Sequence, residues 1–274
     1  MEVLPLSSAL GAEIRGVNAA RPLDDATFAR IRDAWHQYCV ILLRDQDLDE
    51  EQQVRFAERF GPLSPIHTDH HSPTNKAVMY IGNRKKDGKI VGALPLGEMQ
   101  FHSDQCYKER PAMGTMLYAI EIPAEGGNTL FANAYQAYDA LPAEVKERAA
   151  GRKAVQVYDY DGGVLDRKHM VEPQAGLSYA HPLARTHPAT GRKALYVNRL
   201  MTHHIEGLPR DESERLLGVM FATIERPQFI YEHRWRVGDL LLWDNRCTLH
   251  ARRDFDPAAS RWLRRVTIQG EPPR

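Results

Sequence analysis

The chain has 274 residues, of which 43% are hydrophobic and 26% are charged, proportions that are usual for a globular protein. Basic and acidic residues balance at 36 each, which argues against a nucleic-acid or membrane-surface partner, because both favour a basic excess. No apolar run approaches the roughly 18 residues of a membrane-spanning helix, so a spanning segment is excluded.

The three cysteines, Cys39, Cys106 and Cys247, are widely spaced and form no CxxC pair. An odd number of distant cysteines predicts free thiols in a reducing compartment and not a disulfide framework. Residues 1–17 lack a charged segment followed by a long apolar run, so they do not resemble a signal peptide. These features together predict the cytoplasm.

The first predicted elements are two amphipathic helices on either side of a buried strand. Residues 24–38 begin with aspartates that can cap a helix and carry apolar residues at helical spacing. Residues 39–44, CVILLR, form an apolar run with the length of a buried strand. A second helix is predicted over 48–61, with acidic residues in its first turn and Gly61 at its end.

Further along, irregular segments alternate with short strands and two helices. Residues 62–76 are rich in Pro, Ser and His without periodicity, which is typical of a loop. Segments 83–98 and 158–179 are candidate lid loops, because the second is too long for a tight connection and the first has the pattern of an exposed loop or hairpin. Helices are predicted over 137–151 and 211–225. Short apolar runs predict strands at 77–82, 99–104, 114–122, 128–133, 193–198, 239–244, 247–252 and 263–270.

Many short strands with a few helices indicate a mainly β fold, a β-sandwich or jelly roll with helices packed outside. A chain of this length can form one large core, and we expect a single domain over residues 1–274. Neither a GxGxxG segment after a strand nor a GxxxxGK[ST] motif occurs, which argues against the common nucleotide-binding enzymes.

Two His-x-Asp pairs are present, His102 with Asp104 and His67 with Asp69. With 12 histidines in the chain, chance supplies about one such pair, so the spacing alone identifies no site. On a strand, alternate side chains share a face, so His102 and Asp104 could converge on one metal ion. One more histidine would complete the two-histidine, one-carboxylate set of non-haem Fe(II) oxygenases, which leaves positions open for O2 and a bidentate cosubstrate.

His250 is the best candidate for the third ligand, because it follows an apolar strand and a turn. Downstream, Arg261 and Arg265 would share one face of a strand, while Arg264 would point the other way. Two buried guanidiniums that face a metal would be costly without anions to bind them. Two small molecules that carry carboxylates would supply those anions.

With these residues in place, the chain resembles the TauD/TfdA family of Fe(II)- and 2-oxoglutarate-dependent dioxygenases, which includes taurine dioxygenase and the 2,4-dichlorophenoxyacetate oxygenase. The resemblance implies a double-stranded β-helix, the jelly-roll class that the strand pattern also predicts, and a homo-oligomer, either a dimer or a tetramer. It covers nearly the whole chain through motifs in the family's order: GAEIRGVN, FAERFGPL, FHSD, PAEGGNTLFAN, RTHPATGRKALYVN, GDLLLWDNRCTLH and RRVTI.

Matched residue by residue, the family's motif places the catalytic Fe(II) on His102, Asp104 and His250. The same match assigns the cosubstrate 2-oxoglutarate to Thr129, in the segment GGNT, and to Arg261. That arginine would bind the far carboxylate of the cosubstrate through two hydrogen bonds.

Four residues are assigned to the substrate. Arg265 matches the arginine that holds the acidic group in the family's taurine and aryloxyacetate enzymes, with a structural ion pair as the alternative. Glu98 and Met201 replace an asparagine and a substrate-facing phenylalanine of the taurine enzyme, which disfavours taurine. Glu98 could instead pair with a neighbouring basic side chain, and Met201 could fill the core. His67 could reach the substrate, as a histidine of this region does in the family, or lie in a solvated loop.

We therefore expect an oxidoreductase that uses Fe(II), 2-oxoglutarate and O2 to hydroxylate a small organic acid. Hydroxylation next to oxygen, nitrogen or sulfur would let that bond break. The segments RTHPATGRK, HHIEGLP and WDNRCTLH are closer to the aryloxyalkanoate oxygenases, which favours a carboxylate over a sulfonate. The alternatives are a taurine or alkylsulfonate dioxygenase and, in a different class, a non-catalytic jelly-roll metal-binding or sensor protein. The paired arginines argue against that last class.

Overall fold

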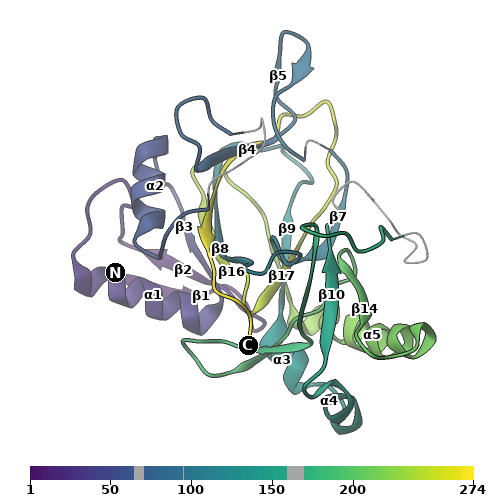
Figure 1. The fold of residues 1–274 in the computed structure, drawn as a ribbon. Helices are drawn as coiled ribbons and strands as arrows, with labels where there is room; N and C mark the ends of the chain where they lie inside the picture. Colours follow the sequence, from purple (N-terminus) through teal and green to yellow (C-terminus); the bar gives the residue numbers. More distant parts are fainter. Residues whose placement is uncertain (65–70, 95, 159–169) are drawn as a thin grey trace.

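The computed structural model describes residues 1–64, 71–94, 96–158 and 170–274. Two β-sheets form its centre, and helices cover the outside (Figure 1). The mainly β class with external helices that the sequence predicts is confirmed. In the described part of the chain, no helix is both long enough and apolar enough to cross a membrane.

The larger sheet has seven strands in the order β1-β2-β3-β16-β8-β18-β4. Neighbouring strands are antiparallel, except that β2 and β3 are parallel. Its strands are β1 Glu2–Pro5, β2 Ala12–Arg15, β3 Val40–Leu43, β4 Val78–Gly82, β8 Ala112–Glu121, β16 Leu240–Asp244 and β18 Trp262–Gln269.

The facing sheet has four antiparallel strands in the order β15-β9-β17-β7. It carries two of the three predicted metal ligands, one on β7 and one on β17. Its strands are β7 Met99–His102, β9 Thr129–Asn133, β15 Ile230–His233 and β17 Thr248–Arg252.

The central strands of the larger sheet are apolar on both faces, because both faces are covered. Leu240 and Leu242 of β16 pack on the helix side, whereas Leu241 and Trp243 pack toward the facing sheet. There the ring of Phe131 lies 5.4 Å from that of Trp243, measured between centroids. Since alternate residues of a strand point to opposite sides, a strand covered on both sides needs an unbroken apolar run.

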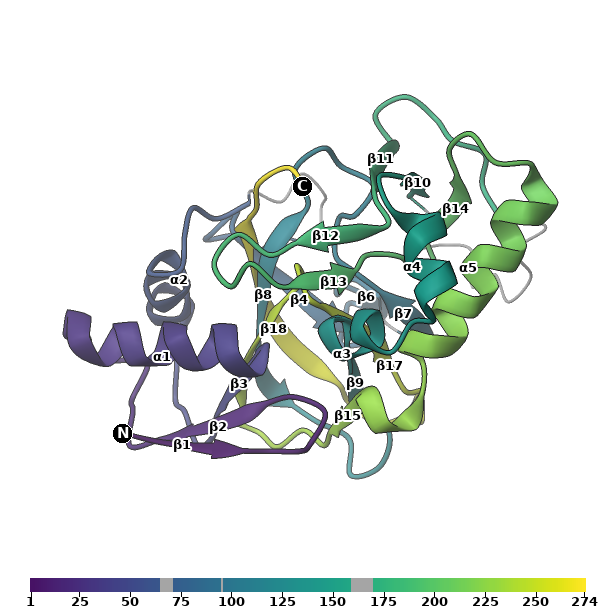
Figure 2. The same ribbon diagram turned by 90° about the horizontal axis from the view of Figure 1, so that it is seen from below.

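Two N-terminal helices, α1 (Asp25–Tyr38) and α2 (Glu50–Glu58), cover the outer face of the larger sheet (Figures 1 and 2). Asp24 caps α1 by accepting a hydrogen bond from a backbone N–H of the first turn, as the sequence predicts. Asp49 and Gln52 form a capping box at the start of α2. Helix α2 ends at Glu58, before the predicted terminus at Gly61.

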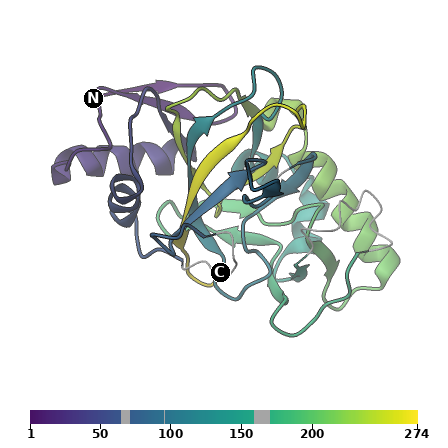
Figure 3. The ribbon, with the colours of Figure 1, turned by 90° about the horizontal axis from the view of Figure 1, so that it is seen from above.

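A separate layer lies on the opposite side of the β-core from α1 (Figure 3). Its largest helix, α5, packs against β14, and the small sheet runs in the order β11-β10-β14. The remaining elements are β5 Lys85–Lys86, β6 Lys89–Ile90, α3 Ala134–Asp139, α4 Ala143–Ala149, β10 Lys153–Val157, β11 Ser178–Pro182, β12 Ala184–Thr186, β13 Lys193–Leu195, β14 Thr202–Ile205, α5 Arg210–Ile224 and the 3-10 helix Pro227–Phe229.

Two predicted elements, the helix over 137–151 and the strand over 99–104, differ from the structure. Strand β7 ends at His102, so Asp104 follows the strand. The single helix expected over 137–151 is two helices, α3 and α4, because Pro142 lies between them and cannot continue a helix. The candidate lid loop 83–98 contains a short hairpin of β5 and β6. Most of the other candidate lid loop, residues 159–169, lies outside the described residues.

Gly82, at the end of β4, brings two chain segments into close contact. Its φ angle is +143°, and a Cβ atom at this position would lie 1.7 Å from the carbonyl oxygen of Arg261. The Gly82 N–H also donates a hydrogen bond to the Ala93 carbonyl at 3.0 Å. Only glycine fits this approach, which fixes the backbone at the predicted cosubstrate arginine.

We expect the substitution Gly82→Ala to lower the free energy of unfolding by about 3 kcal/mol, because the methyl group must displace backbone. Gly218→Ala is the matched control, since a Cβ atom there meets nothing within 4 Å. Gly218 is helical, so alanine at this position should raise the free energy of unfolding by about 0.5–1 kcal/mol. Urea denaturation measures both variants, and an unchanged midpoint for Gly82→Ala would contradict the close approach.

Candidate active site

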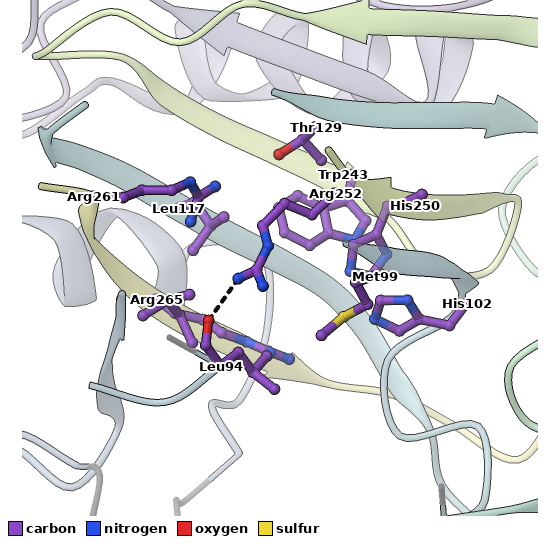
Figure 4. Close-up of a pocket in the computed structure, with 12 residues that line it drawn as sticks. Leu94, Met99, His102, Leu117, Thr129, Trp243, His250, Arg252, Arg261 and Arg265 are labelled. Atoms are coloured by element: carbon purple, nitrogen blue, oxygen red, sulfur yellow. Dashed lines mark hydrogen bonds between the residues drawn. The ribbon is translucent and has the colours of Figure 1, made fainter. Parts of the chain in front are cut away.

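A pocket lies among strands of both sheets (Figure 4). It contains five of the residues that the sequence assigns to metal, cosubstrate or substrate. Its lining consists of Ile81, Leu94, Met99, His102, Leu117, Thr129, Trp243, His250, Ala251, Arg252, Arg261 and Arg265.

The three predicted metal ligands converge beside this pocket, which His102 and His250 line. His102 of β7 and His250 of β17 are directly paired across the sheet, and their ring centroids are 4.1 Å apart. Asp104 Oδ1 lies 4.0 Å from Nε2 of His102 and 3.8 Å from Nε2 of His250. Such a set of two imidazoles and one carboxylate can hold a metal and leave one side of it open.

His102 is held in the tautomer that binds a metal, and both histidines are buried. Nδ1 of His102 lies 2.9 Å from the carbonyl oxygen of Gln100. Since a carbonyl only accepts, Nδ1 carries the proton and Nε2 keeps its lone pair for a ligand bond. Burial lowers the pKa of His102 and of His250, which favours the neutral imidazole.

Asp104 is fully buried and keeps one oxygen available. Burial alone would raise the pKa of this carboxyl. The nearby Arg265 and the two histidines have a larger, opposite effect, so the pKa of Asp104 lies well below the ordinary value. Oδ2 accepts a hydrogen bond from the Thr115 hydroxyl at 2.6 Å. In the described part of the chain, Oδ1 has no hydrogen-bond donor. Nη2 of Arg265 lies 2.9 Å from Oδ1 as an ion pair, without hydrogen-bond geometry. The buried Oδ1 therefore fits a single metal–oxygen bond.

Asn245 ties the aspartate to the strands around it. Its Nδ2 donates to the Thr115 hydroxyl at 3.0 Å, and its Oδ1 accepts from Trp243 Nε1 at 3.0 Å. Its backbone carbonyl accepts from the Ser103 hydroxyl at 3.0 Å. Sequence reasoning gave Asn245 and Thr115 no role. The WDN segment was a usable signal for Asn245, whereas nothing in the sequence marks Thr115.

Thr129 and Arg261 lie in the same pocket, away from the histidines (Figure 4). Nε of Arg261 donates to the Gly127 carbonyl at 3.2 Å, but its buried Nη1 has no partner among the described residues. Burial lowers the pKa of Arg261 to about 9, and the nearby Arg252 adds to this effect. A buried guanidinium with a free N–H is a ready site for a carboxylate.

Arg264 and Arg265 point to opposite faces of β18, as their spacing predicts. Arg265 lines the pocket. Arg264 points to the helix side, where it donates to Gln53 Oε1 at 2.7 Å and to the Leu48 carbonyl at 2.6 Å.

The model of the family described as "Taurine catabolism dioxygenase TauD, TfdA family" matches residues 2–267. The chain belongs to the TauD/TfdA family. This assignment confirms the predicted resemblance and makes the protein a 2-oxoglutarate-dependent dioxygenase, for which the family implies Fe(II) and O2. The jelly-roll fold of this family agrees with the observed pair of sheets.

Individual proteins of the family are similar to this chain over most of their length. An (S)-phenoxypropionate/alpha-ketoglutarate-dioxygenase of Sphingobium herbicidovorans is 33% identical, with 99% of this chain and 96% of that protein covered. An alpha-ketoglutarate-dependent 2,4-dichlorophenoxyacetate dioxygenase of a Burkholderia species is 34% identical, with 90% and 87% covered. The crystal structure of AAD-2 with Mn(II) and N-oxalylglycine superposes with a TM-score of 0.85 at 29% identity, covering 99% of both chains.

The other residues assigned to the substrate lie outside the described pocket lining. The Glu98 side chain is 64% exposed, and its carboxylate lies 3.6 Å from Nη1 of Arg253. Met201 is fully buried in a cluster with Cys106, whose Sγ lies 3.4 Å from the Met201 sulfur. His67 lies outside the described residues, so its contact with substrate stays a prediction.

A second group of possible metal ligands, which contains His187, Asp244 and Cys247, is already saturated. Both carboxylate oxygens of Asp244 accept hydrogen bonds from Arg246, at 2.8 and 2.7 Å. His187 Nε2 adds a contact to Asp244 at 3.0 Å. This buried network joins chain segments and leaves the carboxylate no free lone pair directed at an ion.

Arg252 is a pocket residue that sequence reasoning missed. Its buried guanidinium donates to the carbonyl oxygens of Leu94 at 2.6 Å, Leu96 at 2.8 Å and Gly97 at 2.6 Å, and the first of these bonds is drawn in Figure 4. The Leu94 side chain lines the pocket. Arg252 therefore fixes one wall of the pocket from inside.

For the metal site, we expect Thr115→Val to weaken Mn(II) or Fe(II) binding by about 10- to 100-fold, because Asp104 loses the donor that orients it. Anaerobic metal titration measures the affinity. Thr223→Val is the control: this threonine is also buried, but it donates to the Val219 carbonyl within α5. Equal metal affinity in the two variants would contradict an orienting role for Thr115.

For the pocket wall, we expect Arg252→Lys to lower the free energy of unfolding by about 1–3 kcal/mol in urea denaturation, because the carbonyl groups of Leu94, Leu96 and Gly97 lose donors. Lysine keeps the positive charge, but it cannot reproduce the fork of guanidinium donors. Arg253→Gln is the matched control, because this neighbouring arginine is 53% exposed. If the denaturation midpoint of Arg252→Lys is unchanged, the guanidinium does not hold the wall.

Proposed function

We propose that the metal of this dioxygenase is held by His102, Asp104 and His250, and that 2-oxoglutarate is bound by Thr129 and Arg261. The convergence of the three ligands and the unpartnered Nη1 of Arg261 support these roles. Bound Fe(II), together with 2-oxoglutarate and O2, supplies the oxidising power that hydroxylates a substrate C–H bond. The side chains bind and orient the two organic molecules.

The observation that best supports an acidic substrate is the charge of the pocket. Arg252, Arg261 and Arg265 line it, and none of its described lining residues is acidic. Asp104 and a dianionic cosubstrate together offset the metal and only one of these arginines. A second anion is therefore favoured in the same pocket.

Arg265 is the proposed partner of that second anion. It lies 2.9 Å from Asp104 Oδ1, the oxygen that a metal would take as its ligand. A cation bonded to Oδ1 repels the guanidinium, so Arg265 would then bind the acidic group of the substrate. This contact would hold the substrate beside the open side of the metal.

The apolar part of the lining favours an acid with a sizeable apolar body. Ile81, Leu94, Met99, Leu117 and Trp243 contribute such surface. An aryloxyalkanoate combines an apolar ring with one carboxylate, and the names of the phenoxypropionate and 2,4-dichlorophenoxyacetate relatives agree with this class. Hydroxylation of the carbon next to the ether oxygen would release the aryl group as a phenol. A taurine or alkylsulfonate substrate is the second candidate, because the family description names taurine.

We also propose a single domain over residues 1–274 and a cytoplasmic homo-oligomer. The balanced charge of the chain supports the absence of nucleic-acid and membrane-surface partners. The free, buried cysteines support a reducing compartment.

A substrate panel tests the proposal through succinate release coupled to substrate loss. We expect aryloxyacetates and aryloxypropionates to exceed taurine, alkylsulfonates and sulfate esters in kcat/KM. Arg265→Gln should lower kcat/KM for the best acid by about 100-fold, while the affinity for 2-oxoglutarate stays within about threefold. Arg253→Gln is the control. If a sulfonate exceeds every carboxylate, the proposed substrate class is wrong.

A further inference from the structure

The hydroxyl of Thr129 has a hydrogen-bond partner behind the pocket. Thr129 is 4% exposed, and its Oγ1 lies 3.0 Å from Nε1 of Trp235. An indole N–H can only donate, so Oγ1 must be the acceptor in this bond. The single proton of the threonine hydroxyl therefore remains for another acceptor. The side chain of Trp235 thus sets the direction in which Thr129 can donate.

The side chain of Trp235 is held in place by His233 and the residues that contact His233. The tryptophan is 7% exposed, and the ring of His233 meets its face edge-on, with centroids 4.6 Å apart and an interplanar angle of 88°. His233 contacts Asp239 Oδ2 at 3.1 Å and the Tyr231 hydroxyl at 3.1 Å. Asp239 also accepts two hydrogen bonds of 2.9 Å from Arg44. Neighbouring strands thus fix the indole.

We propose that Trp235 is a positioning residue for 2-oxoglutarate, because it directs the hydroxyl proton of Thr129 toward the cosubstrate carboxylate. This inference rests on the proposed role of Thr129 and Arg261 as the cosubstrate site. Thr129 and Arg261 line one pocket. Arg261 also donates a hydrogen bond to the carbonyl of Gly127, which lies two residues before Thr129 in the chain. The hydroxyl and the free Nη1 are then both donors.

Because both groups donate hydrogen bonds, they favour a ligand whose terminal group only accepts hydrogen bonds. A carboxylate has this property, whereas a terminal amide would place its N–H groups against donors. The indole occupies one of the two lone pairs of the hydroxyl oxygen, which disfavours the arrangement in which the hydroxyl accepts from a ligand. Trp235 thereby contributes to both the affinity and the chemical selectivity of the cosubstrate site without touching the cosubstrate.

The test compares ligand binding in Trp235→Phe and in the unchanged protein. Phenylalanine keeps an aromatic ring beside His233 but lacks the N–H. Calorimetric titration of the Mn(II)-loaded protein with 2-oxoglutarate, and with N-oxalylglycine, should show about a tenfold higher Kd in the variant. The affinity for Mn(II) and the KM of the prime substrate should be unchanged, which separates this effect from general loosening.

Trp35→Phe is the matched control. Trp35 is also buried, but its Nε1 has no hydrogen-bond partner in the described part of the chain. This substitution therefore removes an indole without removing a hydrogen bond, and the Kd for 2-oxoglutarate should stay the same. An equal loss of affinity in Trp35→Phe and Trp235→Phe would overturn the proposal.

A double-mutant cycle with Thr129→Val identifies the route of the effect. If Trp235 acts through the hydroxyl, the double variant should bind 2-oxoglutarate no more weakly than Thr129→Val alone. Multiplying losses would assign Trp235 a general structural role and overturn the proposal. If Thr129→Val itself leaves the Kd unchanged, the proposed cosubstrate site fails, which is a separate result from failure of Trp235.

A measurement on the unchanged protein covers the case in which Trp235→Phe does not fold. In Zn(II)-loaded protein, a hydroxyl that donates to a carboxylate becomes a stronger acceptor for the indole. The Trp235 indole N–H resonance should therefore move downfield when 2-oxoglutarate is added. An unmoved resonance at saturating 2-oxoglutarate would overturn the proposal.

Discussion

The buried carboxylate of Asp104 is the constraint around which the site is arranged. An isolated charge in this position would be strongly destabilising, so it requires positive charge and hydrogen bonds nearby. Thr115 binds one oxygen, and Arg265 and the two histidines lie near the other. The direct pairing of β7 with β17 brings those histidines to the carboxylate.

The same constraint explains why the pocket divides into regions of different chemistry. One oxygen of Asp104 is bound to a hydroxyl, so the metal position has a defined direction. Arg261 and Thr129 lie farther along the pocket, where Nη1 of Arg261 has no partner among the described residues and the Thr129 hydroxyl accepts from Trp235. Among the described residues, Arg252 donates only to neutral carbonyls, so it adds positive charge while it fixes the wall. Two anions and one cation can therefore be arranged in a small volume.

The sequence predicted the parts of this site that depend on motif order, and it missed those that depend on packing. His250 is far in the chain from the His102–Asp104 pair, and only the register of these three residues with Thr129, Arg261 and Arg265 singled them out. Alternation along a strand also predicted the opposite directions of Arg264 and Arg265. The substrate contacts predicted for Glu98 and Met201 rested on a comparison with the side chains of one relative, and neither residue is among the described lining of the pocket.

Contacts between distant segments could not be predicted in this way. The pairing of Thr115 with Asp104 and of Trp235 with Thr129 follows from how strands pack, and these residues form no local pattern. The same is true of the pairing of Arg252 with the carbonyl groups of Leu94, Leu96 and Gly97. The division of the 137–151 helix was accessible from Pro142 alone, since proline interrupts a helix wherever it lies inside one. Local covalent constraints are visible in a sequence, whereas tertiary hydrogen bonds are not.

The ion pair between Arg265 and Asp104 also bears on the order of assembly. A metal-free site with two neutral histidines would leave the carboxylate without a counter-charge, but the guanidinium supplies one from within the chain. The charge of the buried carboxylate is thus offset by a side chain of the same chain, unlike that in small domains whose folding depends on their ion. A metal bonded to Asp104 would take over this role, and the guanidinium would then be available to an anion in the pocket.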